Sequence, residues 1–198
     1  MSLTRRALLA SPLLLTAQAP APLTLTHQGF TVDISIAANL PNRAAIEASL
    51  KRQIDITAGC GAKADIMAFF REQRIGLKTD PRFGPGRFTT AGGVLIQAAA
   101  LPPENSILLH ELCHALHYLY VPDGIRNADI LRFYGNAQRG QLYPANEYLM
   151  SNVGEFFAVT ASLYLWGKVA REPHTRENLR AKQPVYVAWL AELFGVRK

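Results

Sequence analysis

Apolar and polar residues alternate along the early part of the chain, over residues 23–36. A period of two residues predicts β-strands with one buried face, and the His-Gln-Gly tripeptide at 27–29 predicts the turn of a hairpin within them. A Pro-Asn pair then opens a helical stretch at 43–57, and a second, shorter helix is expected at 64–74. The chain therefore begins with a small β-structure and two helices.

The middle of the chain returns to β-structure before its main helix. Residues 74–79 predict a strand, 80–86 a loop rich in proline and glycine, and 88–98 a strand that is broken at Ala-Gly-Gly. The Pro-Pro-Glu-Asn-Ser segment that follows is a strong helix-start signal, and a helix is expected over 108–120, ending at the Pro-Asp-Gly of 122–124.

The last third of the chain is expected to be helical apart from one connection. Residues 126–146 are polar and predict an irregular segment, whereas 152–168 predict an apolar helix that must be buried. Two short helices are expected at 175–182 and 184–194. A small sheet followed by a main helix and a helical C-terminal part predicts the α+β fold class.

The first 21 residues have the features of an export signal. Arg5 and Arg6 precede a short apolar run, and small residues follow up to position 21. This order is typical of a secretory signal peptide, and the paired arginines resemble a bacterial twin-arginine signal. The apolar run is too short for a membrane span of about 20 residues. We therefore expect a signal at 1–21, a single domain at 22–198, and a periplasmic or secreted protein without stable membrane association after signal removal.

The composition is that of an ordinary globular domain, with 198 residues of which 49% are hydrophobic and 18% charged. The formal net charge is +6, but no run of lysine or arginine and no arginine–aromatic pattern is present, so nucleic-acid binding is not expected. Cys60 and Cys113 are the two cysteines. In an exported protein they could form one disulfide, although their spacing does not establish it.

The sequence His-Glu-Leu-Cys-His at 110–114 lies on the predicted main helix. Residues four apart share one helix face, so His110 and His114 can hold one zinc ion with their imidazole nitrogens. Glu111 lies about 100° around the helix from His110, where it can act as a general base on a water molecule without being a ligand. In a chain of this composition roughly 0.006 chance matches are expected, so the motif predicts a metal site.

A catalytic zinc ion takes three protein ligands and keeps one position open. Glu155 is a candidate for the third, because a carboxylate at the start of an apolar, buried helix needs a partner. Asn152 and Glu155 also fit a capping box, in which the glutamate would only close its own helix. Other candidates on the residues alone are Asp123, Asp129, Glu147, His117 and Cys60, with His117 expected beside the site or on the surface.

Three stretches carry a resemblance to a known family. They are His-Glu-Leu-Cys-His-Ala-Leu at 110–116, the segment from Tyr148 through Asn-Val-Gly-Glu-Phe-Phe-Ala at 152–158, and Leu-Arg-Ala-Lys-Gln-Pro at 179–184. Together they resemble the catalytic domain of anthrax lethal factor and the related Pro-Pro endopeptidases, a gluzincin family of zinc metallopeptidases. The resemblance implies a zincin-like catalytic domain over 22–198, one Zn²⁺ ion, endopeptidase activity and Glu155 as the third ligand.

The resemblance also implies a role for Tyr148, since the family has a tyrosine seven residues before the third ligand whose hydroxyl faces the metal. A phenol in that place can donate a hydrogen bond to the oxyanion of a tetrahedral intermediate. The residues alone do not separate Tyr148 from Tyr143 or Tyr134. The chain departs from the family at Cys113, where many members have glycine or another small residue, and in the Val-Thr-Ala that follows position 158.

These patterns together predict a zinc-dependent endopeptidase that acts on a protein or peptide substrate. The segment 88–97 is expected to bind the substrate backbone as an edge strand, with Gly92 and Gly93 allowing close approach, unless the two glycines form a hairpin turn between core strands. The alternative function is a non-catalytic module that zinc stabilises for protein binding. Glu111 separates the two, because a purely structural ion has no use for a base beside it.

Overall fold

The computed structural model describes residues 21–196, and the predicted signal therefore lies, except for its last residue, outside the described part. The first half contains β1 (Thr24–His27), β2 (Phe30–Asp33), α1 (Arg43–Ala58), α2 (Ala64–Glu72), β3 (Ile75–Lys78), β4 (Gly86–Thr89) and β5 (Gly93–Gln97). The second half contains α3 (Ile107–Leu119), α4 (Ala128–Arg139), α5 (Val153–Trp166), α6 (Arg176–Lys182) and α7 (Pro184–Phe194). The α+β class that the sequence predicts is confirmed.

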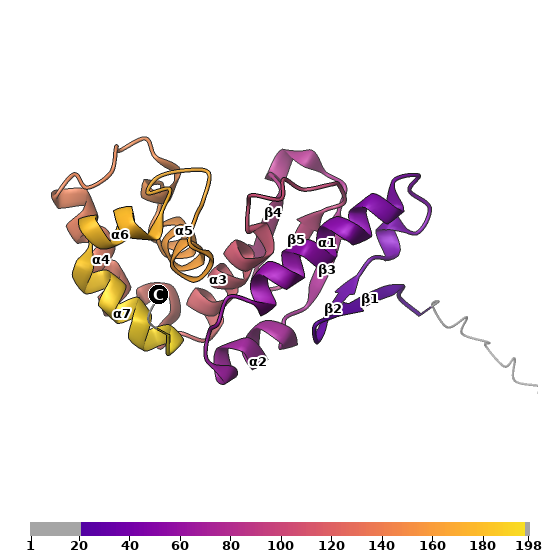
Figure 1. The fold of residues 1–198 in the computed structure, drawn as a ribbon, viewed down its shortest axis with the longest axis horizontal. Coiled ribbons are helices and arrows are strands. Elements are labelled where there is room, and N and C mark those ends of the chain that lie inside the picture. Colours follow the sequence, from indigo (N-terminus) through magenta and orange to yellow (C-terminus); the bar gives the residue numbers. More distant parts are fainter. Residues whose placement is uncertain (1–20, 197–198) are drawn as a thin grey trace, which may run out of the picture.

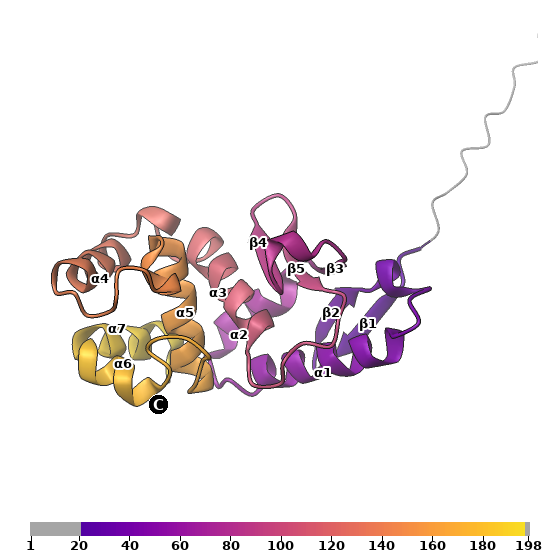
Figure 2. The same cartoon turned by 90° about the horizontal axis from the view of Figure 1, so that it is seen from above.

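The molecule has a sheet half and a helical half. In Figures 1 and 2 the sheet lies with α1 and α2 on one side of the molecule, α4 to α7 lie on the other, and α3 runs between them. Helix α3 packs along α5, which is buried almost all round, as its apolar sequence predicts. None of the described helices combines the length and the apolar character that a membrane span requires.

The five strands lie in the order β1-β2-β3-β5-β4, so β4 is an edge strand. Strands β1 and β2 form the predicted hairpin, with positive φ at both Gln28 (48°) and Gly29 (79°), as a two-residue turn requires. Strands β2, β3 and β5 are parallel neighbours, and β4 pairs antiparallel with β5. The glycines at 92 and 93 therefore belong to a hairpin turn. A Cβ atom on Gly93 would lie 2.4 Å from the backbone oxygen of Arg74.

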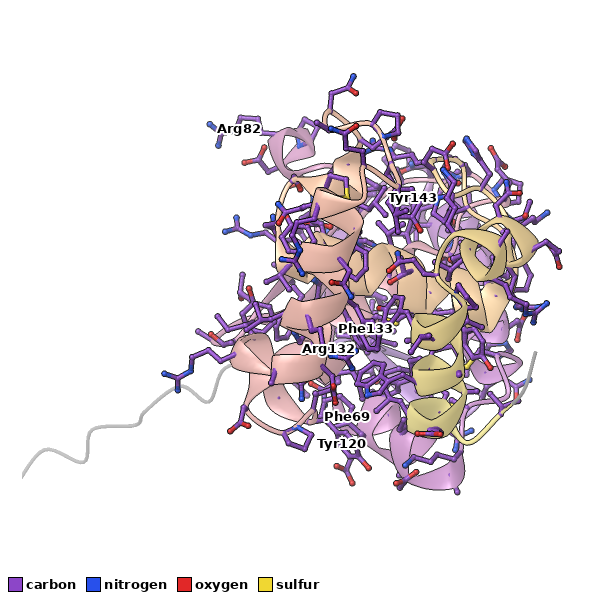
Figure 3. The ribbon with its side chains drawn as sticks, turned by 90° about the vertical axis from the view of Figure 1, so that its left-hand side faces the viewer. Phe69, Arg82, Tyr120, Arg132, Phe133 and Tyr143 are labelled. Carbon is purple, nitrogen blue, oxygen red and sulfur yellow. The ribbon has the colours of Figure 1, made fainter. Side chains whose placement is uncertain are left out.

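The prediction of an irregular connection over 126–146 is wrong in its middle part, which forms α4. This helix buries Ile130, Phe133 and Ala137, which are spaced for one face, and exposes polar residues around the rest of its surface. Phe133 packs against two aromatic rings of α7, with centroids 4.8 Å from Tyr186 and 5.9 Å from Trp189 (Figure 3). The polar composition of the segment concealed a narrow apolar face.

Helix α3 is fixed at both ends by residues from the sheet half. At its start, Gln53 of α1 accepts a hydrogen bond from the backbone N–H of Leu108 at 3.1 Å and donates one to the carbonyl of Asn105 at 2.7 Å. At its end, the Tyr120 ring packs against Phe69 of α2, with ring centroids 5.2 Å apart and planes tilted by 56° (Figure 3). The residues that α3 carries are thereby held at a set position between the two halves.

Candidate active site

The two histidines of α3 and one glutamate of α5 converge on a single point. The Nε2 atoms of His110 and His114 lie 3.2 Å apart, and Oε2 of Glu155 lies 3.4 Å from the first and 3.3 Å from the second. Helix α3 places the two imidazoles on one face because they are four residues apart. The contact between α3 and α5 brings the carboxylate, which is distant in sequence, to the same place.

These three atoms fit a metal ion. A tetrahedral zinc ion with bonds of about 2.0–2.1 Å requires ligand atoms about 3.3–3.4 Å apart, which matches all three separations. Oε2 of Glu155 is buried and makes no hydrogen bond in the described structure, so it has a lone pair that an ion would satisfy. Within residues 21–196 no other group of histidine, cysteine or carboxylate side chains is arranged to hold a metal ion.

Asn152 caps helix α5, while the Glu155 side chain lies with the candidate metal ligands. The side chain of Asn152 accepts a hydrogen bond from the backbone N–H of Glu155 at 2.9 Å, and so caps α5. The carboxylate of Glu155 does not return to the backbone of Asn152, as a full capping box would require, but points to the histidines. Burial acts to raise the pKa of Glu155, yet the neighbouring His110 and His114 outweigh it, and the pKa is lowered far below the usual range.

The other candidate ligands lie away from this point. Asp123 is exposed in a turn with φ of 61°, Asp129 pairs with Arg132 at 2.7 Å, and Glu147 is half-buried but outside the ligand group. Cys60 is buried with its Sγ 3.9 Å from Sδ of Met67. The structure therefore brings together only the His110, His114 and Glu155 candidates among the described residues.

Cys60 and Cys113 are both buried thiols, and no disulfide joins them in the structure. Burial chiefly raises the pKa of the Cys113 thiol, and Cys60 and Glu111 raise it further. Cys113 is fully buried on α3 and does not belong to the ligand group. The Cys113 side chain, where many members of the lethal factor-like family have a smaller residue, therefore packs in the core and is not a candidate ligand.

Glu111 lies beside the ligand group, between α3 and the edge strand. It is only 6% exposed, and burial chiefly raises the pKa of its carboxyl, against the lowering effect of His110 and His114. The backbone N–H of Phe88 in β4 hydrogen-bonds to this carboxyl. Gly86, the first residue of β4, lies directly against it, because a Cβ atom there would be 2.6 Å from Oε1 of Glu111. The edge strand thus fixes where the carboxyl sits.

Tyr148 lies on the other side of the ligand group, in the short turn before α5. Its ring centroid is 6.4 Å from that of His110, and the side chain is 40% exposed. Burial and the nearby carboxylate of Glu155 raise the pKa of the Tyr148 phenol, so the hydroxyl keeps its proton at neutral pH. Tyr134 instead donates to the backbone of Met150, and Tyr143 accepts from Gln183 in the helical half.

His117 lies in the core, although the sequence suggested a place beside the site or on the surface. It is 0% exposed, its ring centroid is 4.8 Å from that of Phe157, and neither ring nitrogen has a hydrogen-bond partner in the described structure. Burial, with a smaller contribution from His114, lowers the pKa of His117 to about 4. The residue is therefore a buried, neutral imidazole with no hydrogen-bond partner in the described structure to offset its desolvation.

Replacement of His117 by leucine is expected to raise the free energy of unfolding by about 1–3 kcal/mol at pH 7, because two unpartnered buried nitrogens are removed. The unfolded chain takes up a proton at the ordinary pKa of 6.5, while folded His117 stays neutral down to about 4. As the pH falls from 6.5 to about 4, the free energy of unfolding of the parent decreases by about 3 kcal/mol through His117. The leucine variant lacks this decrease. Denaturant unfolding of both proteins across this pH range measures the difference.

The matched control for this substitution is His117→Gln, which keeps a buried polar group and is expected to give no gain at pH 7. A leucine variant that is less stable than the parent, or that loses stability with falling pH as steeply as the parent does, would contradict the expectation. Either result would mean that the imidazole has a partner in solution.

Two adjoining pockets form a cleft across the site. The Ile107 pocket, of about 410 Å³, is lined by Ile107, His110, Val159, Val169 and Arg171 among others. The Phe88 pocket, of about 580 Å³, is lined by Phe88, Thr89, His114, Tyr118 and Glu155 among others. Gly86, Glu111 and Tyr148 line both pockets, so the ligand group lies where they meet.

Comparisons with known proteins give a likeness in fold. No family model and no curated protein matches the sequence. Among solved structures, the PRO-PRO endopeptidase PPEP-2 from Paenibacillus alvei has a similar fold, with a TM-score of 0.51 and 17% identity over 82% of this chain and 97% of that one. At this level of sequence identity the likeness is one of fold, and it agrees with the α+β architecture described above.

Proposed function

We propose that the chain is a zinc-dependent endopeptidase, in which His110, His114 and Glu155 hold the ion and Glu111 is the general base. The observation that supports this function best is the convergence of three ligand atoms at tetrahedral spacing where two open pockets meet, with a buried carboxyl beside them. The fold of the endopeptidase neighbour and the resemblance in sequence to the lethal factor and Pro-Pro endopeptidase family support it further.

A bound zinc ion would polarise the scissile carbonyl and lower the pKa of a water molecule towards about 7. Glu111 accepts the proton of the water that attacks the carbonyl, and later returns it to the leaving amine. Burial raises the pKa of this carboxyl, which makes it a better proton acceptor than an exposed glutamate. Gly86 and the Phe88 backbone N–H hold the carboxyl in place for them.

Tyr148 acts on the oxygen that gains charge during the attack. Its phenol stays protonated, because burial and Glu155 raise its pKa, and it therefore remains a hydrogen-bond donor. A donor already in place stabilises the charge without reorganising during the reaction. Tyr148 lines both pockets, which supports a position of its side chain beside the scissile bond of a bound substrate.

The substrate backbone pairs with β4 in this proposal. β4 is an edge of the sheet, no strand of residues 21–196 pairs with its outer side, and its residues 86–89 line the Phe88 pocket. An extended peptide adds to such an edge by main-chain hydrogen bonds. We further propose that the signal at 1–21 is removed on export, which leaves 22–198 as the catalytic unit outside the cytoplasm.

The test is digestion of a proteome-derived peptide library by the purified mature chain, read by mass spectrometry. The zinc-loaded protein is expected to cut internal peptide bonds, the chelated protein to cut none, and the reloaded protein to regain the same cuts. Equal digestion with and without metal would contradict the zinc mechanism. No digestion by a folded protein of full zinc content would contradict the peptidase.

The alternative is a non-catalytic module in which zinc stabilises a protein-binding surface. It predicts that chelation lowers the unfolding temperature while neither form of the protein cuts peptides. The environment of Glu111 supports the enzyme over this alternative. A purely structural ion does not require a buried carboxyl beside it, with Gly86 of β4 packed against that carboxyl.

A further inference from the structure

The connection between α5 and α6 brings an arginine to the mouth of the Ile107 pocket. This connection, residues 167–175, is closed on itself by a β-bridge between Lys168 and Thr175 and by a hydrogen bond of 2.9 Å from Val169 to His174. The carboxylate of Glu172 lies 3.6 Å from Nζ of Lys182 in α6. The backbone around Arg171 is therefore tied down at several points, which suits a residue that selects a ligand.

The guanidinium of Arg171 lies against an aromatic ring and forms no ion pair with a carboxylate of the described residues. It lies 4.5 Å from the centroid of the Tyr148 ring, and the side chain is exposed. No carboxylate among the described residues lies within ion-pair distance of it, although Glu147 lines a neighbouring hollow. The guanidinium lies over the tyrosine ring, and its N–H groups are available to hydrogen-bond another molecule.

The pocket beneath the arginine is largely apolar. Ile107 and Val159 are 7% and 5% exposed, and Val169 lines the wall beside them. Apart from the site residues His110 and Glu111, Arg171 is the only charged side chain that lines this pocket. A side chain that enters here meets mainly apolar walls, the polar side chains of Asn105, Ser106 and Ser162, and one permanent cation.

We propose that Arg171 selects substrates with a carboxylate beside the scissile bond, on the side of the cleft formed by the Ile107 pocket. This inference rests on the proposed peptidase function and names its substrate class. The carboxylate belongs to an acidic side chain or to the C-terminus of a short substrate, and either one accepts a two-pronged hydrogen bond from the guanidinium. A charged hydrogen bond of this kind corresponds to a preference of about 10–100-fold over the neutral amide.

The test starts from one peptide that the parent cleaves, amidated at its C-terminus. Glutamate, glutamine and lysine are placed in turn at each of the three positions on either side of the cut, and the free acid is compared with the amide. The parent is expected to prefer glutamate over glutamine about 10-fold or more in kcat/KM at one position. Arg171→Gln is expected to erase this preference and Arg171→Glu to turn it towards lysine, while Arg171→Lys keeps part of it.

Arg132→Gln is the matched control, because it removes one exposed arginine of α4 that pairs with Asp129 on the same helix. It is expected to keep the preference of the parent. If Arg171→Gln lowers kcat equally for all peptides and the preference survives, Arg171 only positions Tyr148 and the inference is wrong. A preference for the free acid alone assigns the carboxylate to the substrate C-terminus.

Binding separates this inference from the peptidase proposal. Zinc-loaded Glu111→Gln protein, with and without Arg171→Glu, is titrated with fluorescent glutamate and glutamine peptides. Tighter binding of the glutamate peptide, lost with Arg171→Glu, supports the inference even where the parent cuts no peptide. Equal Kd values for the two peptides, together with equal cleavage where cleavage occurs, would overturn it.

Discussion

Replacement of Glu111 by glutamine is expected to lower kcat by about 10²–10⁴-fold at unchanged zinc content. The amide fits the same space against Gly86 but cannot accept the proton of the attacking water. Glu111 is not one of the three candidate ligands His110, His114 and Glu155, so metal binding is expected to persist. Steady-state kinetics on one cleaved peptide, beside metal analysis of the same protein samples, measures both quantities.

The matched control is Glu72→Gln, which removes an exposed carboxylate at the end of α2 and is expected to leave kcat unchanged. An aspartate at position 111 should recover little, because the carboxyl would no longer reach the same point. Full activity of zinc-loaded Glu111→Gln would remove the base from the proposed mechanism. Loss of zinc from this variant would show that Glu111 supports the metal site itself.

The sequence predicts the elements and residues of the site that depend on local spacing. His110 and His114 meet because they are four residues apart on one helix, and helical period is visible in any single sequence. Glu155 required more, since the capping pattern with Asn152 competes with the ligand role. The apolar helix favours a partner for its carboxylate, and the resemblance strengthens the pairing with histidines that end 41 residues earlier in the chain (155 − 114 = 41). The structure places it beside both histidines.

Other features depend on contacts between distant segments, and no pattern in the chain reveals them. Gln53 caps α3 from α1, where the sequence suggested a cap from the residues just before the helix. Helix α4 has only three buried residues within a polar segment, too few to outweigh its composition. His117 continues the helical stripe of the ligands, yet α5 packs over it through Phe157 and buries it.

The roles of the glycines in the β4–β5 hairpin also depend on contacts that the sequence does not reveal. The glycines at 92 and 93 stand out in the sequence as places of close substrate approach, but Gly92 ends the hairpin turn and Gly93 begins β5. Gly86, which looked like the end of a loop, is the residue that contacts the general base. Its backbone has no positive φ, so an alanine is allowed there by conformation and is opposed only by the side chain it meets.

Gly86→Ala is therefore expected to lower kcat by about 10²-fold while the protein stays folded and keeps its zinc. The added Cβ would lie 2.6, 2.7 and 2.9 Å from Oε1, Cγ and Cδ of Glu111, so the carboxyl must move by about 1 Å to restore ordinary contact. The glutamate side chain can turn away, which spares the fold, but a displaced base no longer meets the attacking water. Kinetics, thermal unfolding and zinc analysis of the variant test the three parts of this expectation.

Gly76→Ala is the matched control, because its Cβ would meet the Leu95 side chain at 3.5 Å and the backbone oxygen of Asp33 at 3.9 Å, which are both ordinary contact distances. It makes the same chemical change in the same sheet and is expected to leave kcat near that of the parent. If Gly86→Ala is as active as Gly76→Ala, the position of Glu111 is not set by β4. If the Gly86 variant unfolds instead, the close contact between Gly86 and Glu111 is required for the stability of the sheet half. Loss of activity in a folded, zinc-loaded Gly86 variant alone would show that the edge strand holds the base in its working position.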